Sequence, residues 1–163
     1  MRSKWLCVLA LGAAGAAVYA GDVMATPPSG FNGTVLGPAP LGPLDVKVHA
    51  TTPQPWRIKL RTHGLSDMYV ADNLIDPGGT SGWHRHPGPS LIYVKAGTVT
   101  NYESSDPRCR GHSYGAGSAF VDSGTDVHML RNSGSVEAET IAFQLVPRGA
   151  MRRIDADKPA NCR

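Results

Sequence analysis

Three histidines are the residues of this sequence whose types and spacing are best suited to chemistry. His84 and His86 are separated only by Arg85, and His128 lies further along the chain. On a β-strand, residues i and i+2 point to the same face, so the rings of His84 and His86 can share one ion while Arg85 points away. Imidazole nitrogen is a good ligand for borderline divalent metals. The spacing therefore predicts a metal site made of these three histidines. The alternative is that they are packing groups in a site that binds no metal.

The strands that must position the histidines are short and follow one another closely. Apolar and basic residues alternate over Trp56–Arg61, which predicts a half-buried strand with its basic side chains in water. Short apolar runs predict further strands at residues 68–75, 91–94, 98–102, 119–121, 127–131 and 136–146. A turn is expected at Asp76-Pro77-Gly78-Gly79. Outside the N-terminal leader no segment has a useful helical period, so the sequence predicts an all-β sandwich or barrel.

The sequence around the histidines resembles the cupin superfamily over about residues 67–147. Two motifs carry this resemblance, and each has the order and spacing of the family's pattern. The first motif is matched by Gly78, His84-Arg85-His86 and Gly97. The second is matched by His128 and Asn132, with Gly117 and Asp122-Ser123-Gly124 upstream. The resemblance implies a single-domain, cupin-like (jelly-roll) β-barrel in which His84, His86 and His128 hold one metal ion.

One position departs from the cupin pattern. The family's first motif carries a glutamate where this chain has Ser90, which is neutral and short. A site of three neutral imidazoles favours Fe, Zn, Cu or Ni over Mn, which prefers carboxylate oxygen. Glu103 and Asp122 are the nearest acidic residues that could replace the lost carboxylate, and both are expected to be solvated loop charges.

Two functions remain open on the sequence alone. The cupin resemblance implies a metal-dependent dioxygenase, isomerase or lyase that acts on a small oxygenated molecule, although no second catalytic residue stands out. The alternative is a non-catalytic cupin module with a degenerate metal site that binds a small molecule or metal. The cupin resemblance also implies a homodimer as one assembly. The alternative is that the basic side chains of Arg57, Lys59 and Arg61 prevent the first strand from pairing with another chain, which leaves it as a free edge.

The N-terminus has the pattern of a secretory signal peptide. Arg2 and Lys4 precede an apolar stretch at residues 5–18, and small or aliphatic residues follow at Val18-Tyr19-Ala20. We expect residues 1–20 to be removed, with Ala25 as a second candidate cleavage point. The mature chain would then be periplasmic or secreted and would keep no permanent membrane anchor. The remaining divisions are a Pro/Gly-rich extended lead-in (21–55) with one short strand at 44–49, the barrel (56–148) and a polar C-terminal tail (149–163).

Removal of the N-terminal segment also changes the number of cysteines and the net charge. Cys109 and Cys162 are the two cysteines that remain, and an oxidising compartment predicts a disulfide between them. The alternative is two unpaired thiols. Without Arg2 and Lys4, the Lys+Arg count falls from 16 to 14 against 13 acids, which leaves a net charge of +1. This near-neutral chain has no basic stripe interleaved with aromatics, so we expect a small-molecule partner and no nucleic acid.

Overall fold

The computed structural model describes residues 25–162. The predicted signal peptide, with its cleavage point after Ala20, lies outside the described residues. Within residues 25–162 the chain forms twelve β-strands and no helix. The described part accordingly contains no helix that is long and apolar enough to cross a membrane.

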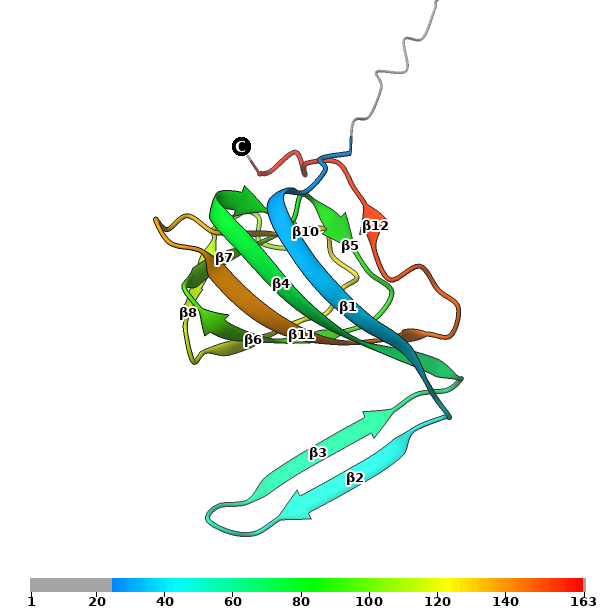
Figure 1. Ribbon diagram of the computed structural model, residues 1–163. Coiled ribbons are helices and arrows are strands. Elements are labelled where there is room, and N and C mark those ends of the chain that lie inside the picture. Colours follow the sequence, from blue (N-terminus) through cyan, green and yellow to red (C-terminus); the bar gives the residue numbers. More distant parts are fainter. Residues whose placement is uncertain (1–24, 163) are drawn as a thin grey trace, which may run out of the picture.

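Ten strands form a nearly closed antiparallel barrel made of two facing halves (Figure 1). One half has the order β1 (Ser29–Leu41), β4 (Ser66–Thr80), β11 (Ala138–Pro147), β6 (Ser90–Ala96) and β9 (Ala119–Asp122). The other half has the order β12 (Ile154–Asp155), β5 (His84–Arg85), β10 (His128–Arg131), β7 (Thr98–Glu103) and β8 (His112–Gly115). Strand β4 joins the halves, because its last residue, Thr80, pairs with Arg131. The all-β prediction is confirmed.

The core lies inside the barrel, where alternate side chains of the strands meet. Ile75, Val94 and Val99 are fully buried there, together with Ala138. Phe143, on the strand predicted at residues 136–146, does not belong to this core, since its side chain is 49% exposed. In β11 the buried positions alternate with more exposed ones, and this alternation places Phe143 on the outer face of the sheet.

The turn predicted at Asp76-Pro77-Gly78-Gly79 does not interrupt β4, which runs through it to Thr80. Gly78 has φ 79°, a left-handed conformation that bends a strand locally without ending its pairing. The Gly78 amide donates to the carbonyl of Asn132, and the Asn132 amide donates to the carbonyl of Gly79. The glycines therefore turn β4 from one half of the barrel into the other.

The lead-in contains a long strand that the sequence analysis did not foresee. Strand β1 pairs with β4 over most of its length despite Pro38 and Pro40. Pro38 falls in the register shift between Leu36 and Ala39, where no ladder hydrogen bond is required of it. Within the described chain β1 pairs only with β4, and an edge strand tolerates proline.

Strands β2 (Asp45–Ala50) and β3 (Trp56–Arg61) form a separate hairpin that projects from the barrel (Figure 1). Both predicted strands exist. The prediction that Trp56–Arg61 is half-buried is wrong, since all six of its residues are exposed. They are exposed because, within the described chain, β3 pairs only with β2 in a sheet separate from the barrel.

The predicted disulfide is confirmed. Cys109 and Cys162 are bonded, with their Cα atoms 5.0 Å apart. The bond ties the connection between β7 and β8 to the end of the C-terminal tail. Before this bond the tail forms β12, which pairs with β5 beside His84. The tail therefore closes one side of the barrel.

Candidate metal centre

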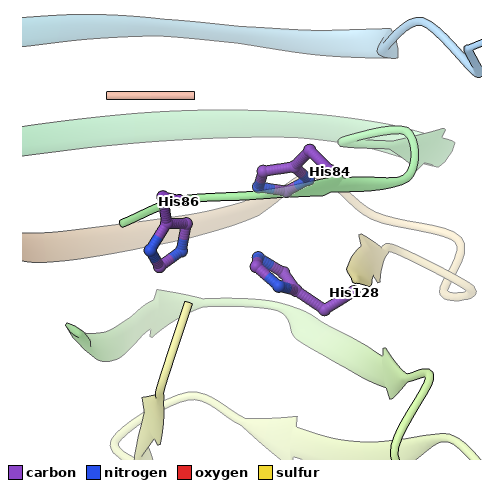
Figure 2. A group of neighbouring side chains, drawn as sticks. All are labelled: His84, His86 and His128. Atoms are coloured by element: carbon purple, nitrogen blue, oxygen red, sulfur yellow. The ribbon is translucent and has the colours of Figure 1, made fainter. Parts of the chain in front are cut away.

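The structure brings the three predicted histidines together inside the barrel (Figure 2). His84 lies on β5, His86 directly follows that strand, and His128 begins β10, where it pairs with His84. Each ring offers a nitrogen that lies within 4.8 Å of the nitrogens offered by the other two. His86 and His128 are both 3% exposed. Three histidines are thus positioned to bind one metal ion.

Each of the three rings is oriented by a backbone carbonyl. The Nδ1 atoms of His84, His86 and His128 lie 2.9, 2.6 and 2.8 Å from the carbonyl oxygens of Gly82, Gly88 and Asp126. A carbonyl only accepts, so each Nδ1 carries the proton and donates. The proton on Nδ1 leaves the lone pair of the neutral imidazole on Nε2, which is the ligating form.

Asp122 is a fourth group at this centre. Its Oδ2 lies 2.7 Å from His128 Nε2 and 3.4 Å from His86 Nε2. Its Oδ1 accepts a hydrogen bond of 2.7 Å from the Gly124 amide, which fixes the carboxylate. The expectation that Asp122 is a solvated loop charge is wrong, because the residue is 4% exposed. It is buried because β9 pairs with β6 and turns Asp122 into the barrel.

The register between these strands compensates for the missing glutamate. Ser90 is the residue directly opposite Asp122 in the β6–β9 pair. The Ser90 hydroxyl lies 3.4 Å from His86 Nε2, so position 90 faces the centre, as the family pattern requires. The carboxylate that is absent from β6 is therefore supplied by the facing residue of β9. Glu103 does not take this role, since it accepts a hydrogen bond from Asn101 and does not line the cavity.

The electrostatics of the centre suit a bound cation. Burial, followed by the charges of His128 and Arg153, lowers the pKa of His84 to about 3, so this ring is neutral at pH 7. Burial alone would raise the pKa of Asp122, but its close contacts with the imidazoles of His128 and His86 outweigh this effect, and the pKa lies below its usual value. A carboxylate oxygen and an imidazole nitrogen approach to 2.7 Å only with a positive centre between them. A proton or a metal ion can be that centre.

The histidines line a cavity of about 260 Å³ inside the barrel. Part of its wall is apolar and consists of Ile92, Phe120 and Ala142. The polar part includes Gln144 from β11 and two arginines, Arg152 and Arg153, from the C-terminal tail. The sequence analysis assigned the tail no role. The signals available in β11 were Thr140 and Gln144, two polar residues that alternate with Ala138, Ala142 and Val146 on its buried face.

Trp83 and the remaining three histidines do not line the cavity. Trp83 is 4% exposed but does not line the cavity, so it belongs to the packing of the barrel. His49, His63 and His112 are exposed, as expected from their positions outside the two motifs.

Comparison with known proteins agrees with this architecture. The family model for the cupin domain matches residues 74–143, the stretch that carries both histidine motifs. The matched stretch is therefore a cupin domain. No curated protein matches its sequence.

Three solved structures illustrate the similarity in fold. An uncharacterised Klebsiella pneumoniae protein with a double-stranded β-helix domain is 20% identical, has a TM-score of 0.48, and the match covers 72% of this chain and 86% of that one. Peruvianin-I, a latex protein of Thevetia peruviana described as a cysteine peptidase, is 19% identical with a TM-score of 0.50, covering 79% and 69%. A polyketide cyclase of Streptomyces resistomycificus is 16% identical with a TM-score of 0.46, covering 58% and 65%. At these identities the similarity concerns the fold alone.

Proposed function

We propose that this protein is an exported metal-dependent cupin. It binds one divalent ion through His84, His86, His128 and Asp122 and acts on a small oxygenated molecule in the barrel cavity. One observation carries the proposal. The Asp122 carboxylate lies next to the Nε2 atoms of His86 and His128, and the Nδ1 atoms of these two rings donate to backbone carbonyls. Three imidazoles and a carboxylate form a donor set that fits a divalent transition metal.

The chemistry of the proposed enzyme is divided between the ion and the wall of the cavity. A bound ion with open positions would activate oxygen or polarise a substrate oxygen, as a dioxygenase, isomerase or lyase requires. The backbone carbonyls hold the three rings in their ligating form, and the Gly124 amide holds Asp122. Ile92 and Phe120 keep one wall of the cavity apolar. The expected ions are Fe, Zn, Cu or Ni, and with Asp122 as a ligand the reason to favour them over Mn is gone.

Export is part of the proposal. A disulfide persists in an oxidising compartment, and Cys109–Cys162 supports passage of the mature chain to a periplasmic or extracellular location. The signal pattern of residues 1–20 supports the same route. N-terminal sequencing of the exported protein tests it, because a mature chain that still begins at Met1 would contradict cleavage.

A non-catalytic binding module is the second candidate function, and one observation favours it. Among the described residues that line the cavity, the ionisable side chains other than the four proposed ligands are Arg152 and Arg153. Arginine does not exchange its proton at neutral pH, so the cavity offers no separate general acid or base. The module would capture its ligand and release it unchanged.

Element analysis of protein purified from its own export compartment is the first test. We expect the wild type to contain one transition-metal ion per chain and both His86→Ala and Asp122→Asn to contain much less. His112→Ala is the matched control, since His112 is exposed on β8, and it should keep the metal. Equal metal content in the wild type and His86→Ala would refute the site. Turnover of a substrate panel that is lost with the metal and restored by one metal separates the enzyme from the binding module.

A further inference from the structure

Arg152 is a half-buried cation that faces the cavity. Its Nη1 donates to Gln144 Oε1 at 2.8 Å, and no carboxylate of the described chain lies within ion-pair distance of it. Burial, followed by the charge of Arg153, lowers the pKa of Arg152, so its charge is held at a cost in free energy. A buried charge is normally retained where a partner compensates it. Arg153, by contrast, is already committed to Asp155 and to the carbonyl of Ser81.

The surroundings of Arg152 define the kind of partner that fits. Gln144 and Thr140 stand on the same inner face of β11 and line the cavity with it, and both are buried. Ala142 on the same face of β11 and the residues in register with it, Ile92 and Phe120, make the adjoining wall apolar, and the histidines line the same cavity. A small organic molecule with an anionic oxygen group could bind the guanidinium of Arg152 and the amide of Gln144 through its oxygen atoms and contact the apolar wall with its carbon atoms. Arginine recognises carboxylates through such a fork, with parallel hydrogen bonds.

We infer that the cavity binds a small organic carboxylate whose anionic group pairs with Arg152. The inference deepens the proposed function, because the bound molecule would share the cavity with the metal. The Arg152–carboxylate contact itself requires no metal, so the two ideas can fail separately.

Calorimetric titration of the full mature chain tests the inference, with malonate as the probe and malonamide as its uncharged counterpart. Titrations are done on metal-free and on zinc-loaded protein. We expect malonate to bind and malonamide to bind at least tenfold more weakly. Arg152→Gln should weaken malonate binding at least tenfold, and Arg152→Lys, which keeps the charge and loses the fork, should fall between.

Arg131→Gln is the matched control, since Arg131 is exposed and lies outside the cavity, and it should bind malonate as the wild type does. Zinc content should be the same in all four proteins. Equal binding of malonate and malonamide, no malonate binding, or unchanged binding in Arg152→Gln would each overturn the inference. Loss of malonate binding in Arg152→Gln in a protein that takes up no zinc would leave it standing and refute the metal site.

The hairpin has one apolar face that the described part of the chain leaves exposed. The cross-strand pairs Val46–Leu60, Val48–Ile58 and Ala50–Trp56 share this face. Leu60 is 40% exposed and Trp56 is 53% exposed. The opposite face carries most of the charge of the hairpin, from Asp45, Lys47, His49, Arg57, Lys59 and Arg61. A two-stranded hairpin alone in water is only marginally stable, so this apolar face needs a surface to pack on.

The outer face of the barrel carries an apolar stripe that is equally uncovered. The stripe is a row of residues in register across β1, β4, β11, β6 and β9, namely Leu36, Val70, Phe143, Leu91 and Val121. Leu91 is 55% exposed, and Leu36 and Val121 are each 64% exposed. Five strands at about 4.8 Å make the stripe about 19 Å long, and a six-residue strand of the hairpin is about 20 Å long. The two surfaces match in length and in chemistry.

In the described part of the structure the hairpin is a separate sheet that does not pair with its own barrel. The hairpin leaves the barrel between Leu41 and Ser66 and runs beneath it, as a separate two-stranded sheet (Figure 1). Arg148 fixes this junction, since its Nη2 donates to the carbonyls of Leu41 and Ser66 at 3.0 and 3.4 Å. A second copy of the chain can present its stripe to the hairpin.

We propose that two copies form a two-fold dimer in which the hairpin of each covers the stripe of the other. In this arrangement each copy contributes both surfaces. The exposed side chains include two aromatic ones, Trp56 on the hairpin and Phe143 on the stripe, at 53% and 49% exposed. Aromatic side chains bury the largest areas when an interface covers them. The basic face of the hairpin stays in water.

Sedimentation of the mature chain tests this dimer. We expect the wild type to be dimeric, and both Ile58→Arg on the hairpin and Leu91→Glu on the stripe to be monomeric with the fold and disulfide intact. A mixture of the two variants should dimerise again, because one junction then pairs Arg with Glu and the other is native. Lys59→Gln, on the opposite face of the same strand, is the control and should remain dimeric. A monomeric wild type, a monomeric mixture, or a monomer that sediments with anionic lipid vesicles would each overturn the proposal.

Discussion

Replacement of Asp122 by asparagine is the change that most directly tests the composition of the metal centre. The amide keeps the oxygen that accepts from Gly124, so the turn after β9 should be preserved. It removes the negative charge that lies 2.7 Å from His128 Nε2 and 3.4 Å from His86 Nε2. The variant therefore separates the charge of the carboxylate from its place in the fold.

The size of the expected effect follows from the charges. Two unit charges 4 Å apart interact by about 4 kcal/mol at an effective dielectric constant of about 20, and a divalent ion doubles this. Desolvation of the carboxylate and the ion offsets more than half of the gain. A net loss of about 3 kcal/mol corresponds to a roughly 100-fold weaker metal affinity. Competition against a chromophoric chelator, with zinc at constant pH, measures it.

Position 90 supplies a rescue experiment. Ser90 faces Asp122 across the β6–β9 pair, and its hydroxyl lies 3.4 Å from His86 Nε2. Ser90→Glu combined with Asp122→Asn returns one carboxylate to the centre from the other strand, so we expect most of the lost affinity to return. Wild-type affinity in Asp122→Asn, or no recovery in a folded double variant, would refute the reasoning that Asp122 stands in for the glutamate of the cupin motif.

Four further outcomes are expected. Gly124→Ala should lower both the melting temperature and zinc affinity, because the residue has φ 81° and a Cβ would meet His86 Nδ1 and the carbonyl of Gly88. Cys162→Ser should lower the free energy of unfolding in urea by about 4 kcal/mol, since the disulfide closes a separation of 53 residues. Val94→Ala should cost about 2 kcal/mol in the same assay, because the side chain is fully buried. Zinc at 100 times its dissociation constant should stabilise the chain by about 2.7 kcal/mol, and a chelator, or His128→Ala, should abolish this gain.

The three histidines could be found from the sequence because their signal is local. The spacing of His84 and His86 defines one face of a strand, and the cupin pattern adds His128. Asp122 could not be assigned in the same way. It is followed by Ser123 and Gly124, which are typical of an exposed turn, and only the pairing of β9 with β6 shows that its side chain points inward. The pairing of two strands that are distant in sequence thus decides which acidic residue lies at the metal centre.

The same limit explains the other differences between prediction and structure. Prolines within residues 29–41 argued against a strand, but an edge position and a register shift accommodate them. The alternation in Trp56–Arg61 correctly predicted a strand. Alternation shows that the two faces of a strand differ in polarity, but it does not show whether another part of the protein covers the apolar face. Arg152 carries no local signal for a role in the cavity, since the path of the tail along β5 brings it there.

The three hydrogen bonds from Nδ1 to Gly82, Gly88 and Asp126 end on main-chain oxygens, a group that every amino acid supplies. A substitution at Asp126 leaves its carbonyl in place, so the orientation of the His128 ring does not depend on which side chain stands there. The residues that line the remainder of the cavity can then change through evolution without altering the orientation of the imidazole rings. A barrel built in this way can acquire a new ligand preference by exchanging wall residues one at a time while its metal-binding geometry is inherited unchanged.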